Sequence, residues 1–184
     1  MLKPYIVEKD VLRFVGKCSR IENSENVGEG IGSLFKQLGD IFSNIKNSID
    51  EKFYGITVNF ANGTENSIRN YWLCKEVESL WHNNEVGQWE RLETGMETLI
   101  LPATRWVYIP VRYDDPFVKS LAPEECQDDP SQLTNYVYGW AHLWIKENGY
   151  TPQDYPYELE IYGLNDGYEE IEGGANITLA IPII

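Results

Sequence analysis

The chain has 184 residues with 15 Lys and Arg against 29 Asp and Glu, which gives a formal charge of −14 at pH 7. A hydrophobic share of 42% is enough for a buried core and excludes a disordered acidic chain. No Lys/Arg cluster is present to follow a phosphate backbone or an anionic membrane, so direct nucleic-acid and membrane binding are not expected. No apolar run approaches the roughly 18–20 residues that span a bilayer, and the first ten residues lack a signal-peptide pattern.

The residues that most often bind metals are sparse and scattered. They are Cys18, Cys74, Cys126, His82 and His142. An odd number of widely separated cysteines indicates free thiols in a reducing compartment. A zinc site needs a denser cluster of nitrogen and sulfur ligands. We therefore predict a cytoplasmic protein with no metal site and no cofactor.

The first half of the chain predicts a strand, a helix and two further strands. Apolar and polar residues alternate over residues 11–18, which predicts a strand. Apolar residues at spacings of three and four then predict an amphipathic helix over residues 31–50. Residues 53–60 alternate again, and Asn62-Gly63 is a hairpin turn signal. A returning strand is therefore predicted over residues 68–80.

The second half predicts the same order of elements. The polar residues 82–94 predict a loop, and residues 99–113, rich in Val, Ile, Trp and Tyr, predict one strand. After an acidic loop, Ser131 is a suitable N-cap for a second amphipathic helix that ends near Asn148-Gly149. Two more strands are predicted, over residues 157–163 and 175–183.

The repeated order of elements indicates an internal duplication. A Tyr-Gly pair follows the helix in each half, as Tyr54-Gly55 and Tyr162-Gly163. No linker separates the halves. We predict one domain over residues 1–184, with halves of about 1–81 and 99–184 that share one sheet.

Several short motifs resemble those of one family, the GyrI-like or AraC-type effector-binding superfamily. In the second half they are Trp144-x-x-x-Asn148-Gly149-Tyr150, Glu160-x-Tyr162 and Ile181-Pro182-Ile183. In the first half they are Tyr54-Gly55, Tyr71 followed by Glu76-Val77, and Leu101-Pro102-Ala103 followed by Tyr108. The resemblance runs in order along nearly the whole chain.

The resemblance implies an α+β fold of duplicated β-α-β-β halves related by a pseudo-twofold. These halves form an antiparallel sheet with two main helices on one side and a ligand cleft on the other. In this family the module binds small molecules, often cationic and lipophilic, and it is stand-alone or fused to a DNA-binding domain. Residues 1–30 hold no helix-turn-helix, so a stand-alone member is expected.

Strand alternation assigns the charged candidates to one side of the sheet. Because side chains alternate across a strand, Leu159 and Ile161 point one way while Glu160 and Tyr162 point the other way. The helices need an apolar face to pack against. We therefore predict that Glu160 and Tyr162 face away from the helices, into the cleft.

Trp106 and Tyr108 are predicted to share that cleft face, because Val107 and its alternate neighbours take the helix side. Aromatic faces attract cations, and a poorly solvated carboxylate supplies the opposite charge. A face with Trp, Tyr and Glu therefore predicts a cage for a hydrophobic cation. The remaining ligand-binding candidates are Tyr54, Tyr71, Trp72 and Trp140. Tyr71 and Trp72 lie on opposite faces, so at most one of them lines the cleft.

Three functions follow from these residues. The first is a stand-alone binding module that senses or sequesters a small aromatic cation. The second is an acidic interaction protein of the gyrase-inhibitor type, with a protein partner. The third is a hydrolase in which Glu160 and Tyr108 or Tyr162 act as base and acid. No catalytic motif with a nucleophile and base is present, so a non-enzymatic role is preferred and no catalytic residue is assigned.

Overall fold

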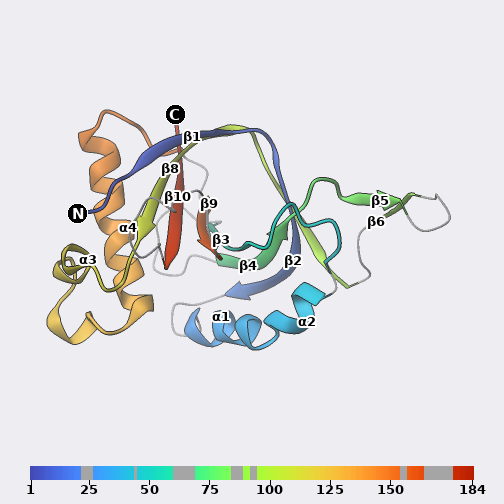
Figure 1. Cartoon of the computed structure of the whole chain (residues 1–184), viewed down its shortest axis with the longest axis horizontal. Helices are drawn as coiled ribbons and strands as arrows, with labels where there is room; N and C mark the ends of the chain where they lie inside the picture. The colour runs from blue at the N-terminus through green and yellow to red at the C-terminus, as the bar shows by residue number, and fades with distance from the viewer. Residues whose placement is uncertain are drawn as a thin grey trace. The chain divides into compact units, whose positions relative to one another are not determined.

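The computed structural model describes residues 1–21, 27–43, 45–59, 69–83, 89–91, 95–153, 157–163 and 176–184. The chain forms two compact units (Figure 1). The first unit contains residues 1–9, 104–155 and 160–184, and the second contains residues 10–103 and 156–159. The units differ from the predicted halves at their ends. Residues 1–9 group with the second half, and residues 82–103 group with the first.

The first unit is a sheet with helices against one of its faces. Its strands lie in the order β1 (Tyr5–Lys9), β8 (Thr104–Val111), β10 (Ile177–Ile183) and the second half of β9 (Tyr157–Tyr162), from Glu160 on. β8 is antiparallel to both β1 and β10. The helices are α3 (Pro116–Ser120), the 3-10 turn η2 (Glu124–Cys126) and the long α4 (Pro130–Glu147).

The second unit repeats this plan. Its main strands lie in the order β3 (Phe53–Asn59), β4 (Arg69–Glu76), β2 (Leu12–Ile21) and β7 (Glu97–Leu101), with antiparallel pairing throughout. Its helices are α1 (Val27–Lys36) and α2 (Leu38–Ser43). β5 (Trp81–Asn83) and β6 (Trp89–Arg91) form a separate pair where a loop was predicted. The predicted turn at Asn62-Gly63 lies outside the described residues.

The common topology confirms the predicted α+β class and the β-α-β-β duplication. In each unit the last strand lies between the other two, as β8-β10-β9 and as β2-β4-β3. Each unit also has an edge strand, β1 beside β8 and β7 beside β2. Neither edge strand was predicted as such. β1 was missed, and β7 was merged with β8 although Pro102, which has no N–H to donate, separates them.

The Tyr-Gly repeat that suggested the duplication is not a structural equivalence. Tyr54 is the second residue of β3, whereas Tyr162 is the last residue of β9. The duplication is therefore visible in strand order and not in that motif.

The core of the first unit lies under α4 (Figure 1). One stripe of the helix is buried: Leu133, Val137, Ala141 and Ile145. It packs with alternate residues of the two central strands: Val107, Ile109, Val111, Ile177, Leu179, Ile181 and Ile183. The predicted facing of Val107, Ile109 and Val111 toward the helix is confirmed.

The core of the second unit lies under α1 and α2, which are shorter than the predicted helix of residues 31–50. Phe53 of β3 packs against Phe35 and Phe42 of the two helices, with ring centroids 6.4 and 5.2 Å apart. The helical conformation ends before Asn47, which adopts a φ of 59°. Asn tolerates this left-handed conformation better than most residues, and the apolar spacing continues past Ser43, where α2 ends.

The start of α4 is fixed by Asp129 rather than by the predicted Ser131. The Asp129 carboxylate accepts hydrogen bonds from the backbone N–H groups of Ser131 and Gln132, at 2.9 and 3.3 Å. Pro130 occupies the first helical turn, where its missing N–H costs nothing. The predicted end at Asn148-Gly149 is confirmed, with Gly149 at a φ of 80°.

We expect Asp129→Ala to lower the melting temperature at pH 7, because two backbone N–H groups lose their acceptor. The hydrogen bond from the Ser131 side chain, followed by those from the backbone, holds the pKa of Asp129 below its ordinary value. The stabilisation is therefore complete above the unfolded pKa of about 3.9 and is lost as the pH falls through the lower folded pKa. Thermal melts at pH 7 and at about pH 2 test this. The deficit of the variant should shrink in acid, and Asp128→Ala, at an exposed ion pair with Lys119, is the matched control.

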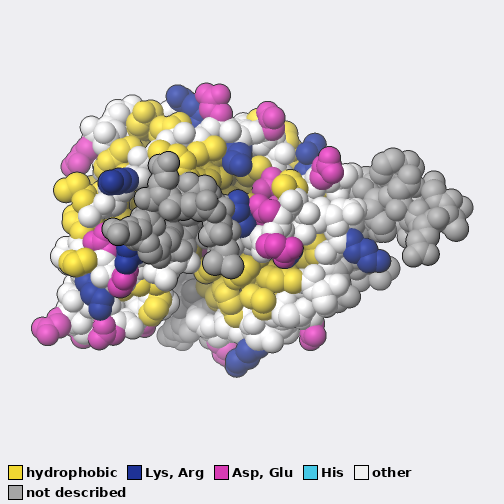
Figure 2. All heavy atoms as spheres, in the orientation of Figure 1, with side chains coloured by type: hydrophobic (Ala, Val, Ile, Leu, Met, Phe, Trp, Pro, Cys, Tyr) yellow, Lys and Arg dark blue, Asp and Glu magenta, His cyan; other side chains and the backbone are white. Residues whose placement is uncertain are grey.

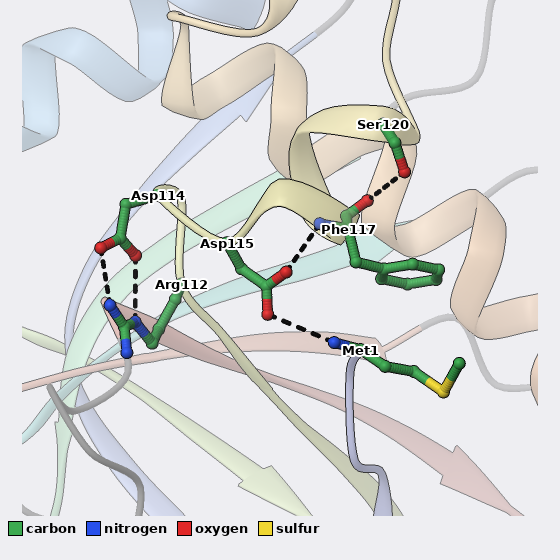
Figure 3. A network of polar contacts seen from close by, with 6 residues as sticks. All are labelled: Met1, Arg112, Asp114, Asp115, Phe117 and Ser120. Carbon is green, nitrogen blue, oxygen red and sulfur yellow. Dashed lines mark hydrogen bonds and ion pairs between the residues drawn. The ribbon is translucent and has the colours of Figure 1, made fainter.

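The corner between β8 and α3 is held by two neighbouring carboxylates (Figure 3). Arg112 donates to both oxygens of Asp114, at 3.0 and 2.6 Å. Asp115 accepts from the backbone N–H of Phe117 at 2.7 Å, and its other oxygen accepts from the amino group of Met1 at 3.5 Å. This corner fixes the backbone on both sides of Tyr113.

Candidate functional site

The carboxylate of Glu160 forms the centre of the candidate site. Glu160 and Tyr162 lie on the same face of β9, and both are partly buried. The Tyr162 hydroxyl donates a hydrogen bond of 2.6 Å to Oε2 of Glu160. A short hydrogen bond to a carboxylate is stronger than one between neutral groups, so it fixes the orientation of both side chains.

The predicted facing of Glu160 and Tyr162 away from the helices is wrong. Tyr162 packs against the core that α4 covers, and Glu160 shares its face. Leu159 and Ile161 therefore take the opposite face, where they are also buried. The prediction failed because both faces of this sheet are apolar. Trp106, for example, is fully buried on the face away from α4. Polarity alone does not identify the helix side of such a strand.

Tyr113 is the site residue that the sequence analysis missed. Its hydroxyl lies 2.9 Å from Oγ1 of Thr134 on α4, and its backbone N–H donates to Oδ1 of Asn176 at 2.9 Å. Burial raises the pKa of Tyr113, the hydrogen bond to Thr134 opposes this, and the charge of Glu160 adds to the increase. The sequence did contain a signal for its position. The alternation of side chains along the strand places Tyr113 on the same face as Val111.

Trp106 and Tyr108 lie on the face of β8 opposite to α4. Trp106 is fully buried, and no hydrogen-bond partner for its indole N–H is present in the described part of the chain. The ring of Tyr108 meets that of Tyr5 edge-on, with centroids 5.7 Å apart. The predicted cage of these two residues with Glu160 is therefore split between two faces of one sheet.

Three further candidates lie in the second unit. Tyr71 packs in the core under α1 and α2, whereas Trp72 lies on the opposite face, so the predicted opposition of the two is confirmed. Tyr54 shares the face of Trp72. Its hydroxyl donates to Oε2 of Glu76 at 3.0 Å, and its ring packs edge-on against Phe14. This hydrogen bond and this ring contact give Tyr54 a structural role within its own unit.

The last candidate, Trp140, projects from α4 and is partly buried against the core of the first unit. Its ring meets Phe117 of α3 at a centroid distance of 5.8 Å and an interplanar angle of 81°. Trp140 therefore joins the two helices and belongs to the same unit as Glu160.

The described residues offer little for nucleophilic or metal chemistry. All three cysteines are free, and burial raises the pKa of the Cys18 thiol to about 11, which keeps it protonated at neutral pH. No group of three His, Cys, Asp or Glu residues suited to a metal ion occurs in the described ranges. Among the helices of the described part, none combines the length and apolarity needed to cross a membrane.

The visible surface agrees with the acidic composition. On the described part of the face in Figure 2, Lys and Arg side chains lie scattered among acidic and apolar ones and do not gather into one basic patch.

Comparison with solved structures identifies the fold. No protein-family model and no curated protein matches the sequence. SAV2435 bound to tetraphenylphosphonium is similar with a TM-score of 0.62 at 9% identity, over 99% of this chain and 94% of that one. A putative bacterial transcription regulation protein from Staphylococcus aureus MU50 reaches 0.60 at 12% identity, over 98% and 97% of the two chains. The EcmrR C-terminal domain reaches 0.54 at 14% identity, over 100% and 98%.

These likenesses show that the chain shares its fold with these three structures over nearly its whole length. At such low identity, they establish the fold and not the ligand.

Proposed function

We propose that the protein is a small-molecule-binding module that takes amphipathic organic cations at Glu160, as a sensor or a sequestering protein. The observation that carries the proposal is the partly buried Glu160 carboxylate, oriented by a hydrogen bond from Tyr162. Both side chains belong to the first unit and lie on one face of its sheet.

The chemistry favours a cation over a neutral or anionic ligand. A carboxylate that is partly removed from water gains most from an opposite charge brought next to it. The rings of Tyr113 and Tyr162 add apolar surface and attract cations through their faces. An anion of the same shape meets repulsion from the carboxylate, which gives the site its selectivity.

The fold comparison supports this class of ligand. SAV2435 is bound to tetraphenylphosphonium, a lipophilic cation, and nearly its whole length has the fold of this chain. The two alternatives, an inhibitor that binds a protein partner and a hydrolase that uses Glu160, have no comparable support in the described residues.

We expect tetraphenylphosphonium to bind the wild type, and Glu160→Gln to weaken that binding by about tenfold or more, since a charge-assisted contact contributes about 1.4 kcal/mol or more. Isothermal titration at pH 7 measures both affinities. Tetraphenylborate, an anion of the same shape, should not bind. Glu147→Gln, an exposed carboxylate on α4, is the matched control and should retain wild-type affinity.

Equal binding of the cation and the anion would contradict the proposal, as would an unchanged affinity in Glu160→Gln. Incubating the wild type with candidate esters or strained rings tests the hydrolase alternative. Product formation that Glu160→Gln abolishes would replace the binding role with an enzymatic one.

A further inference from the structure

The outer side of α4 carries large apolar side chains that are exposed to solvent. Leu143 is 60% exposed and Tyr136 is 38% exposed. Together with the exposed Gln132 and Gly139, they follow one another at spacings of four, three and four residues. Residues at these spacings lie in one line along a helix. This outer line of α4 faces away from the buried stripe that begins at Leu133.

The outer line also lacks charge. Residues 131–145 contain no Asp, Glu, Lys or Arg, although 24% of the residues in the whole chain are charged. The solvent face of a helix in a globular protein usually carries charged and polar side chains. A net charge of −14 repels two copies of the chain from each other. The outer line is therefore a surface on which two copies can meet without bringing carboxylates together.

Gly139 lies in the middle of the outer line, and the packing of the chain itself does not require a glycine there. A Cβ at this position would meet nothing within 4 Å. Glycine inside a helix weakens it relative to alanine. Because the distance between two packed helices depends on the side chains at their contact, a glycine lets a second helix come close.

We propose that the outer line of α4 binds a second copy of the chain, with the two helices antiparallel about a twofold axis beside Gly139. A twofold contact uses the same surface patch on both copies. Tyr136 lies three residues before Gly139 and Leu143 lies four residues after it. The axis therefore brings Tyr136 of each copy against Leu143 of the other. The antiparallel arrangement also sets opposite ends of the two helix dipoles side by side.

The contact is limited to one helix of each copy. α4 has 18 residues, so it is about 27 Å long and about 10–12 Å across, too small to supply the roughly 800 Å² that each partner contributes to a standard interface. We therefore expect a weak dimer, with a Kd of about 10–100 µM. This dimer does not depend on the ligand proposed for Glu160.

Sedimentation velocity of the whole chain, over about 5–500 µM, measures the dimer. Leu143→Glu places two like charges in the contact and should raise the Kd by about tenfold or more. Ile49→Glu is the matched control. Ile49 is 54% exposed and belongs to the second unit, so this variant adds the same charge at a similar exposure and should keep the wild-type Kd.

A double variant, Tyr136→Lys with Leu143→Glu, tests the antiparallel pairing. In the proposed geometry the introduced positive charge of each copy faces the introduced negative charge of the other. The double variant should therefore dimerise at least about threefold more tightly than Leu143→Glu alone. Within one copy the two positions are about 10.5 Å apart along the helix, too far to pair with each other.

The outcomes decide between this surface and others. A wild type that stays monomeric up to about 500 µM overturns the proposal, and so does a dimer that Leu143→Glu leaves intact. A dimer that Leu143→Glu weakens and the double variant does not recover overturns the antiparallel pairing at Gly139. Far-UV circular dichroism of each variant verifies that it is folded.

Discussion

Gly16→Ala is expected to destabilise the protein by about 3 kcal/mol or more, at the upper end of the usual cost of overpacking. Gly16 lies in β2 opposite Cys74 of β4. A Cβ added there would lie 2.2 Å from the carbonyl oxygen of Leu73 and 2.5 Å from Cβ of Cys74. Both neighbours are backbone or next to it, so neither can rotate away. The strands would have to separate, with loss of ladder hydrogen bonds.

Urea denaturation followed by far-UV circular dichroism measures this effect, and Gly139→Ala is the matched control. Gly139 lies in α4, and a Cβ there meets nothing within 4 Å. The control should be stabilised by roughly 0.5–1 kcal/mol, since alanine is the better helix former. A Gly16→Ala variant with wild-type stability would show that β2 and β4 do not approach as closely as described.

The second large effect is expected for Leu179→Ala, which should cost about 2–5 kcal/mol. Leu179 is fully buried in the middle of β10, opposite Ile109 of β8 and in the core under α4. Truncation removes apolar contacts and leaves a cavity that the rigid neighbouring strands cannot fill.

The matched control for this cavity is Leu143→Ala on α4. Leu143 is 60% exposed, so its truncation should change the free energy of unfolding by no more than about 0.5 kcal/mol. Chemical denaturation of the two variants in parallel compares one substitution in two environments. Similar losses in both would contradict the placement of Leu179 in the core.

Periodicity predicted the helix α4 and the facing of the residues of β8. The stripe from Leu133 to Ile145 gave α4, and alternation in β8 gave the correct facing of Val107 and Ile109. The edge strands were harder to predict from the sequence. β1 pairs with β8, almost a hundred residues away in the chain, and nothing local in residues 5–9 signals that partner.

The site was predicted in part. The Glu160-x-Tyr162 motif indicated the carboxylate and its tyrosine, and the structure joins them by a hydrogen bond. Their facing was assigned by polarity, which does not decide when both faces of a sheet are buried. The sequence analysis did not select Tyr113, because its side-chain hydrogen bond is formed with Thr134, a residue 21 positions later on α4. Only the fold brings the two together.

The pairing of β1 with β8 has a consequence for synthesis of the chain. β1 ends at residue 9 and β8 begins at residue 104, so residues 10–103 separate the strand from its partner. At about 5–20 residues per second, the ribosome leaves the N-terminal strand without that partner for roughly 5–20 seconds. Strands β2, β3, β4 and β7 all emerge within this interval. The main strands of the second unit can therefore pair with one another before β1 meets its partner β8.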